Sequence, residues 1–252
     1  MHFGLPHDAS LDGFRIDRLI ALGAAVQIPI VIILTLWLIA SSVLWGRRHP
    51  AVSDRGSLRH RAPLVLSLLV LVLLAALDAV SWVQSNRDLD QHFWNFGAAE
   101  GDPRTVRLEV NAHQWAWAAR YAGPDGRFNT GDDAVTLDDL RVPVDTPILI
   151  ELTSTDVIHD FYLPNFRLKQ DVIPGRVTRV LFTATETGEF EIACSQHCGV
   201  NHYKMRGLLR VLSQEDYRRW LQLASANSQA SYDPADSAAH WGWDWQREPA
   251  GS

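Results

Sequence analysis

The feature that decides the fold lies at residues 194–205, which read CSQHCGVNHYKM. Two thiols (Cys194 and Cys198), an imidazole (His202) and a thioether (Met205) fall within this stretch, directly after a segment of strand character. Soft ligands of this kind suit copper, and a His/Cys set with a weak axial Met is typical of electron-transfer copper sites. A site with one copper needs a single Cys. A second Cys four residues further on lets both sulfurs bridge two metals.

His159 supplies a second imidazole from upstream, in the stretch Asp-Val-Ile-His. Taken singly, each residue has a simpler interpretation, with His159 as a hydrogen-bonded loop histidine, Met205 as a core filler and Gln196 as a surface amide. A Cys194–Cys198 disulfide accounts for the thiols in an oxidising compartment, but it leaves the spacing of the imidazole and the thioether unexplained. A structural zinc site does not use Met. The combination therefore favours copper.

The segments around this stretch have β character. They are rich in Val, Ile, Leu, Phe and Trp, are separated by Gly, Pro and Asp turns, and cover residues 105–121, 147–153, 177–185, 188–194 and 207–212. Several short strands at this spacing predict a sandwich or a barrel. After the last strand, Ser213 and Asp216 resemble a capping box, and Tyr217, Trp220 and Leu221 recur at helical spacing. This pattern predicts a short amphipathic helix that closes the sandwich.

Two long segments near the N-terminus avoid charge. Residues 19–45 contain no Asp, Glu, Lys or Arg, and residues 62–84 contain only Asp78. Each exceeds the roughly 20 residues that cross a bilayer as a helix, so both are predicted to be transmembrane helices. A secretory signal peptide, the competing interpretation of the first segment, has an apolar region of only about 7–15 residues.

The connection between these helices predicts their orientation. Residues 46–61 contain five arginines against one acid, Asp54. By the positive-inside rule, such a short basic loop faces the cytoplasm. A hairpin with its loop inside places both termini, and everything after about residue 85, on the periplasmic side of the cell's inner membrane.

Composition limits the partners and the domains. The chain has 252 residues, a formal net charge of -6 and a mean hydropathy of -0.07. Nucleic acid needs a basic face, so a cationic partner fits better. We predict an N-terminal segment with the helical hairpin (1–87), a periplasmic β domain (88–223) and an Ala/Ser/Trp-rich tail (224–252). The tail contains Trp241, Trp243 and Trp245, to which the sequence assigns no role.

Three stretches resemble one protein family, in the expected order. Residues 194–205 resemble the CuA loop of cytochrome c oxidase subunit II, and residues 156–176 (DVIHDFYLPNFRLKQDVIPGR) resemble its D-V-x-H-x-F segment. Residues 111–121 (NAHQWAWAARY) resemble its H-Q-W-x-W strand. With the helical hairpin, the resemblance extends to about residue 220. It implies an all-β cupredoxin-like Greek-key sandwich preceded by a two-helix transmembrane hairpin.

The resemblance also implies a binuclear copper centre, in which two thiolates bridge the metals, each copper has one imidazole, and a thioether and a carbonyl are axial ligands. These groups are Cys194 and Cys198, His159 and His202, Met205, and the backbone carbonyl of Gln196. Trp115 matches the position through which electrons enter from cytochrome c, whereas Trp117 fits a core aromatic better. Gln196 stands where most members carry a Glu that helps to bind magnesium at the interface with subunit I.

The function implied is that of a respiratory haem–copper oxidase subunit, which takes electrons from cytochrome c or another small cationic donor and passes them to a haem of subunit I for oxygen reduction. The expected partners are subunit I, other oxidase subunits, the donor and the lipid bilayer. Residues 46–63 contain no Glu, although many members have one there at a proton channel, so a haem–copper nitric oxide reductase is the alternative. A membrane-tethered copper chaperone is less favoured, because the H-Q-W-x-W strand has no purpose in one.

Overall fold

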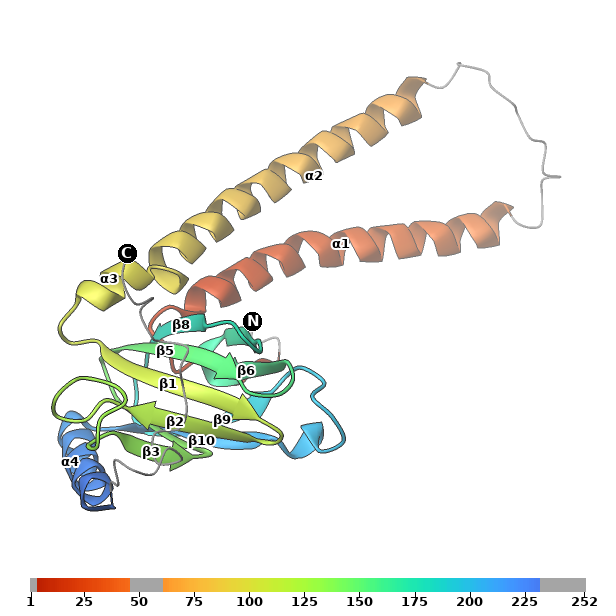
Figure 1. Cartoon of the computed structure of the whole chain (residues 1–252). Coiled ribbons are helices and arrows are strands. Elements are labelled where there is room, and N and C mark those ends of the chain that lie inside the picture. Colours follow the sequence, from red (N-terminus) through yellow and green to blue (C-terminus); the bar gives the residue numbers. More distant parts are fainter. Residues whose placement is uncertain (1–3, 46–60, 232–252) are drawn as a thin grey trace. The chain divides into compact units, whose positions relative to one another are not determined.

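The computed structural model describes residues 4–45 and 61–231. The chain divides into two compact units. The first runs from Arg15 to Leu89, and the second combines the segment before Arg15 with the chain from Asp90 onward. The first unit is helical, and the second is built mainly from β-strands (Figure 1). The domain boundaries at residues 87 and 223 stay predictions.

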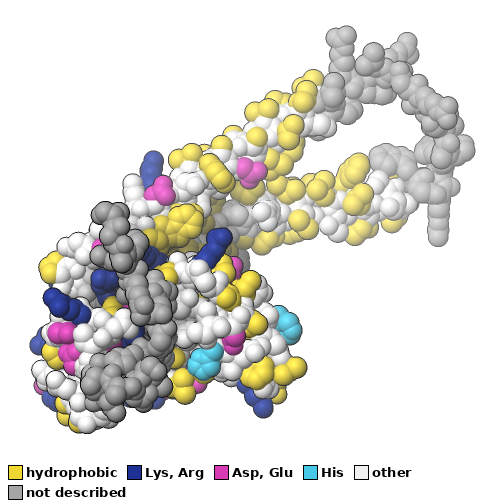
Figure 2. Space-filling view, in the orientation of Figure 1, with side chains coloured by type: hydrophobic (Ala, Val, Ile, Leu, Met, Phe, Trp, Pro, Cys, Tyr) yellow, Lys and Arg dark blue, Asp and Glu magenta, His cyan; other side chains and the backbone are white. Residues whose placement is uncertain are grey.

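Two long apolar helices make up most of the first unit. α1 covers Gly13–Trp45 and α2 covers Arg61–Asp88. The segments Gly13–Leu44 and Ser67–Gly101 are long and apolar enough to cross a membrane, with mean hydropathies of 2.5 and 2.0. Figure 2 shows a mainly hydrophobic surface along both helices. A helix that is apolar on all sides and unburied is typical of a membrane span, so the predicted pair of apolar helices is confirmed.

Both helices extend beyond the predicted segments. α1 begins at Gly13 rather than at residue 19, and α2 ends at Asp88 rather than at residue 84. Polar contacts explain the extension at one end of the pair. Arg15 Nη1 donates to Asp88 Oδ1 at 3.2 Å, and Gln84 Nε2 donates to the same carboxylate at 3.0 Å. Most of the arginine-rich connection (46–60) lies outside the described residues, so the membrane orientation stays a prediction.

The second unit contains two five-stranded sheets. In spatial order, the first sheet is β3 (Ala134–Leu137), β2 (Ala116–Tyr121), β1 (Val106–His113), β5 (Pro147–Ser154) and β8 (Thr178–Thr183). The second sheet is β4 (Asp139–Pro143), β10 (Arg206–Leu212), β9 (Gly188–Cys194), β6 (His159–Leu163) and β7 (Leu168–Val172). The pairs β1/β5 and β4/β10 are parallel, and the other pairs are antiparallel. The predicted all-β, cupredoxin-like sandwich is confirmed.

The core lies between the sheets because each strand turns an apolar face inward. On β1, for example, Leu108 and Val110 are fully buried in the core. The alternating outer face of the first sheet also buries polar residues. Arg120 donates from Nε to Glu109 at 2.7 Å, and from Nη1 to Asn129 Oδ1 at 2.6 Å. Asn129 belongs to the turn-rich connection between β2 and β3, which therefore covers this charged pair.

The segment predicted as one strand, 105–121, is a hairpin. His113 pairs with Ala116, so Gln114 and Trp115 form the two-residue turn between β1 and β2. The sequence hides this turn because it contains no Gly or Pro and continues the apolar pattern. The strands β3, β4, β6 and β7 were also not predicted. Their runs are short, at four or five residues each, and β6 and β7 contain charged residues that interrupt the alternation.

Short helices connect these elements. Between α2 and β1 lie a π-helix, η1 (Leu89–Phe93), and α3 (Phe96–Gly101). Two 3-10 helices follow, η2 (Pro164–Phe166) and η3 (His202–Lys204). The last element is α4 (Gln214–Ser231).

Both ends of the described chain pack on the sandwich. Ala9 is fully buried, its N–H donates to Asn165 O at 2.8 Å, and Ser10 forms a bridge with Ala184. Sequence reasoning assigned no role to this N-terminal segment. At the other end, the predicted helix after Ser213 is confirmed as α4, and the Asp216 N–H donates to Ser213 Oγ at 3.1 Å. The tryptophans of the tail lie outside the described residues.

Candidate metal centre

The predicted ligands meet where three elements of the second sheet end. His159 is the first residue of β6, and Cys194 is the last residue of β9. The β9–β10 connection carries the remaining candidates and returns to Cys194, whose N–H donates to Met205 O at 3.2 Å. β6 and β9 are neighbours, with Phe161 opposite Cys194. This pairing brings a histidine from an earlier part of the chain to the cysteine loop.

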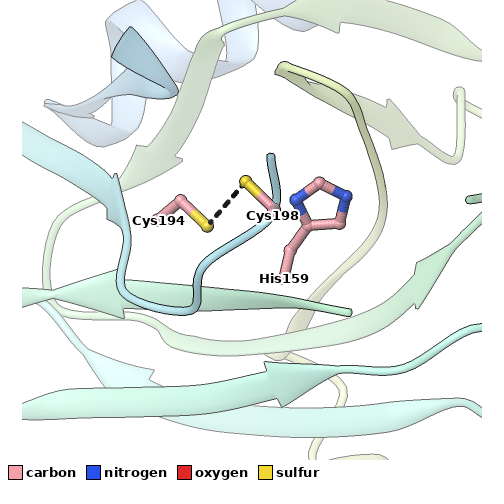
Figure 3. A group of neighbouring side chains, drawn as sticks. All are labelled: His159, Cys194 and Cys198. Carbon is pink, nitrogen blue, oxygen red and sulfur yellow. Dashed lines mark hydrogen bonds between the residues drawn. The ribbon is translucent and has the colours of Figure 1, made fainter. Parts of the chain in front are cut away.

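The two cysteine sulfurs face each other without a covalent bond (Figure 3). Their Sγ atoms lie 3.6 Å apart, whereas the sulfurs of a disulfide are about 2.05 Å apart. The ligand atoms of His159, Cys194 and Cys198 all lie within 4.8 Å of one another. Among the described residues, this is the one group of three or more His, Cys, Asp or Glu side chains close enough to share a metal ion.

Two further candidates border this trio. Met205 Sδ lies 3.7 Å from Cys198 Sγ and 3.1 Å from His159 Nδ1, and the side chain is buried. His202 Nδ1 lies 3.6 Å from Cys198 Sγ, on the 3-10 helix η3. The fold thus brings together both thiols, both imidazoles and the thioether that were singled out in the sequence.

Gln196 contributes its backbone rather than its side chain. Cys194 Sγ lies 3.2 Å from the carbonyl oxygen of Gln196, so this oxygen faces the cluster. The amide side chain is exposed, and its Oε1 accepts from the N–H of His197 at 3.2 Å. The geometry agrees with a carbonyl role that does not depend on the side chain.

The electrostatics of the cluster favour a cation. Burial opposes ionisation of Cys194, but hydrogen bonds with His159 and with the backbone of Asp160 outweigh it and lower the pKa of Cys194 to about 6. Burial and the adjacent Cys194 raise the pKa of Cys198 to about 12. Without a metal, the pair therefore holds one thiolate at neutral pH. A bound metal would displace the second proton.

The donor set fits a soft metal. Thiolates, imidazoles and a thioether are ligands that select copper, and the buried thioether is foreign to structural zinc sites. Two sulfurs that each bind one metal at about 2.3 Å subtend an angle of about 100° when they lie 3.6 Å apart. This angle is close to tetrahedral, so the thiols are placed to bind the same ion or ions without a large movement.

Trp115 lies against the cysteine loop. Its Nε1–H donates to Cys198 O at 3.2 Å, and the ring is half-buried. The prediction for Trp117 is confirmed, since it is fully buried and meets the His159 ring edge-on at a centroid distance of 6.2 Å. Both tryptophans therefore contact a ligand-bearing residue, one from the outside and one from the core.

Two polar residues at the site were missed by sequence reasoning. Asp156 Oδ1 lies 2.8 Å from His159 Nε2, and Gln114 Nε2 donates to Cys198 O at 2.8 Å. Both residues lie inside the quoted stretches, Asp156 at the start of DVIH and Gln114 in H-Q-W. Asp156 lies three residues before His159 and Gln114 lies directly before Trp115, and this proximity was the signal that could have identified them.

Acids near the three motifs would form the docking face that attracts a cationic donor. One of them, Asp160, is only 3% exposed and does not contribute to such a face. It is buried because β7 pairs with β6 and places Asp171 opposite it. The Asp156 carboxylate is hydrogen-bonded to His159. In addition, the cysteine loop carries an exposed positive charge, that of Lys204.

Comparisons with known proteins match this domain. Residues 132–211 match the family model "Cytochrome C oxidase subunit II, periplasmic domain". The chain is 36% identical over 139 residues to the alternative cytochrome c oxidase subunit 2 of Bradyrhizobium diazoefficiens, a match that covers 46% of this chain and 50% of the relative. It is 33% identical over 134 residues to cytochrome c oxidase subunit 2 of Synechocystis, covering 53% and 36%.

Among solved structures, the periplasmic domain of cytochrome oxidase subunit II (CoxB) of Bradyrhizobium japonicum is similar, with 29% sequence identity and a TM-score of 0.44. That match covers 48% of this chain and 94% of the solved domain. The chain spans half or less of the length of the first two curated relatives. The matched domain includes every predicted metal-ligand residue, and this part of the chain is similar to the periplasmic domain of cytochrome c oxidase subunit II.

Proposed function

We propose that this chain is the electron-accepting subunit of a respiratory haem–copper oxidase. It takes electrons from cytochrome c, or from a similar small cationic donor, at a binuclear copper centre and passes them to a haem of subunit I, where oxygen is reduced. One observation carries the proposal. Two unbonded thiols lie 3.6 Å apart, with His159 and His202 beside them and Met205 buried against them.

The chain's residues divide the work of holding the metals. Cys194 and Cys198 would supply thiolates to both coppers, His159 and His202 would each supply one imidazole, and Met205 and the Gln196 carbonyl would complete the ligand set. Bound copper would supply a one-electron redox couple. Because Cys198 and Met205 are 2% and 1% exposed, the protein excludes water from this side of the site. Buried ligands such as Cys198 and Met205 do not suit a copper chaperone, which needs exchangeable ligands.

Electrons enter through Trp115 in this proposal. The indole packs on the cysteine loop and donates to Cys198 O, so it offers a short route from the protein surface to a bridging ligand. The chain's net charge of -6 favours a cationic donor by long-range attraction, which fades as salt shortens the screening length to about 8 Å at physiological strength. The burial of Asp160 removes one acid from the expected docking face.

The membrane part fits the same role. In this proposal the two apolar helices anchor the chain in the inner membrane, and the basic connection at residues 46–61 supports a periplasmic β domain by the positive-inside rule. There the domain meets a periplasmic donor, while the helices pack against subunit I.

The test is copper loading of the full chain in detergent. We expect two copper ions per chain and the delocalised mixed-valence signal of a bridged pair. His202→Asn should reduce the copper count and the mixed-valence signal. The control His7→Asn changes an exposed histidine that is not one of the proposed ligands, and it should change neither quantity. One copper per chain with a single-copper spectrum, or a Cys194–Cys198 disulfide that persists under copper loading, would contradict the proposal.

The terminal acceptor needs a separate test, because a nitric oxide reductase would use the same ligands. This alternative is supported by the absence of Glu from residues 46–63, where many oxidase subunits have one at a proton channel. Purification of the complex through this chain, followed by assays of oxygen and nitric oxide consumption, distinguishes the two. We expect oxygen to be consumed faster. Faster consumption of nitric oxide would assign the chain to a reductase instead.

A further inference from the structure

We propose that Gln114 and Asp156 form a clamp that sets the distance between two ligand-bearing elements, the start of β6 and the cysteine loop. This inference rests on the proposed copper site and assigns positioning roles to two residues that would not touch the metal. The clamp consists of the β1–β2 turn, the Asp156 side chain and the backbone of Cys198. It crosses between the two sheets at the end of the sandwich that carries the ligands.

The first half of the clamp holds His159. Asp156 Oδ1 lies 2.8 Å from His159 Nε2, and Asp156 Oδ2 accepts from the Gln114 backbone N–H at 2.6 Å. Each carboxylate oxygen thus serves a different element. Donation of the Nε2–H to Asp156 leaves the Nδ1 lone pair directed at the cluster, where Nδ1 lies 3.1 Å from Met205 Sδ. A carboxylate that accepts from a ligating histidine fixes both the tautomer and the ring orientation.

The second half holds the cysteine loop. Gln114 Nε2 and Trp115 Nε1 both donate to the Cys198 carbonyl, at 2.8 Å and 3.2 Å. Gly199 allows this close approach, since a Cβ there would lie 2.8 Å from Gln114 Nε2, and its φ of +118° is unfavourable for other residues. Gln114 therefore joins both halves, with its N–H on Asp156 and its side chain on Cys198.

The clamp matters because the pairing between its two ends is short. β6 and β9 share two residue pairs, Phe161 with Cys194 and Tyr162 with Ala193, and one further backbone bond runs from the Ser195 N–H to Asp160 O. His159 and Cys198 both lie beyond these pairs, at the start of a strand and within a loop. The bonds through Gln114 fix this part of the site before a metal arrives, and such preorganisation of ligands raises metal affinity.

Asp156→Asn tests the hydrogen bonds of the clamp without changing the packing around it. Besides His159, Oδ1 accepts from the Val157 N–H at 2.6 Å and from Ser154 Oγ at 3.2 Å. An Asn should keep its single carbonyl oxygen at this crowded position and turn its NH₂ toward the Gln114 N–H. The bond between the two halves is then lost, with little change in volume. Gln114→Met removes the bond to Cys198 O and keeps the length of the side chain.

The experiment measures copper retention and the copper spectrum of the full chain in detergent. Variants loaded with copper are mixed with a chelator, and the rate of copper loss is followed. We expect Asp156→Asn to release copper about 10-fold faster, because the residue that orients His159 is no longer tied to the Gln114 turn. Gln114→Met should release it about 10-fold faster. Both should retain two coppers at the start, with altered hyperfine splittings. The exposed controls Asp145→Asn and Gln222→Met should match the unchanged chain.

The double variant tests the link itself. If Gln114 and Asp156 act as one clamp, Gln114→Met should add little once Asp156→Asn has freed the turn. Release rates that multiply independently, or that stay unchanged in Asp156→Asn and Gln114→Met, would overturn the proposal. If Asp156→Asn unfolds the domain, Gln114→Met alone decides, because its side chain is exposed. Failure of the unchanged chain to bind two coppers would instead contradict the proposed function, so the two failures are distinguishable.

Discussion

Two polar clusters of the second unit differ in which groups they bring together. On the outer face of the first sheet, the Arg120 guanidinium donates to Glu109 and Asn129 and lies 3.7 Å from Asp133. Donors there meet acceptors, and a cation meets anions. At the end of the sandwich, two thiols, two imidazoles and a thioether face one another instead. All of these groups offer lone pairs.

This difference separates a structural cluster from a ligand site. A buried ion pair compensates its own desolvation within the protein. A cluster of lone-pair donors contains no cation of its own. It is complete only when a metal cation binds from solution. Removing one residue should therefore damage stability in the first region and metal binding in the second. The following experiments test this contrast.

The largest effect is expected at the bridging thiols. Cys198→Ser replaces a soft thiolate with a hydroxyl, and the two imidazoles cannot compensate for the lost thiolate. We expect copper to fall from two ions per chain to one or none, with loss of the mixed-valence signal, as measured by metal analysis and electron paramagnetic resonance. Retention of both coppers would show that Cys198 does not bridge them.

A large effect on stability, without an effect on copper, is expected at Arg120. Arg120→Met leaves the fully buried Glu109 without its cation, which typically costs about 3–5 kcal/mol. The free energy of unfolding should be measured by denaturant titration of the full chain above pH 7, where Glu109 is ionised. The control Arg104→Met breaks an exposed pair with Asp102 and should change stability by less than about 1 kcal/mol. Equal losses in both variants would contradict a structural role for the buried pair.

A pH dependence should accompany the same pair. Burial raises the pKa of Glu109 to about 7 against the attraction of Arg120, whereas the unfolded chain has the ordinary value of 4.5. The folded state therefore binds the proton more tightly, so this group's contribution favours folding below pH 4.5 and is lost as pH rises toward 7. The loss should reach at most about 3 kcal/mol. Glu109→Gln should remove this part of the dependence, and an unchanged pH profile would disprove the assignment.

A smaller effect is expected on electron transfer at Trp115. Trp115→Phe removes the hydrogen bond from Nε1–H to Cys198 O and replaces the indole with a smaller aromatic ring. Transfer within the docked complex should slow severalfold, while copper content, donor affinity and its salt dependence stay the same. Stopped-flow reduction by a small cationic cytochrome separates these steps. Unaltered transfer would remove the case for electrons entering here.

The smallest effect is expected at Gln196. Its backbone carbonyl faces Cys194 Sγ, whereas its side chain is exposed and bonds only to the adjacent His197 N–H. Gln196→Ala should therefore leave the copper stoichiometry and spectrum unchanged. A loss comparable to that in Cys198→Ser would mean that the side chain is itself a ligand.

The sequence by itself determined the features that depend on neighbouring residues. The apolar spans, the helix after Ser213 and the types of ligand at residues 194–205 follow from composition and short spacings, which are local properties of a chain. The strands that ended at Cys194 and began near Arg206 were also predictable, because each has a long apolar pattern.

Only the tertiary structure decided which distant groups meet. His159 reaches the cysteine loop because β6 pairs with β9, and Asp160 is buried because β7 covers it on the other side. The turn at Gln114 and Trp115 reaches Cys198 from the other sheet, and no pattern within the turn announces that contact. Strand pairing joins residues far apart in the chain, so its outcome depends on the whole set of sheets. That is why the ligand types were predictable and the contacts that hold them in place were not.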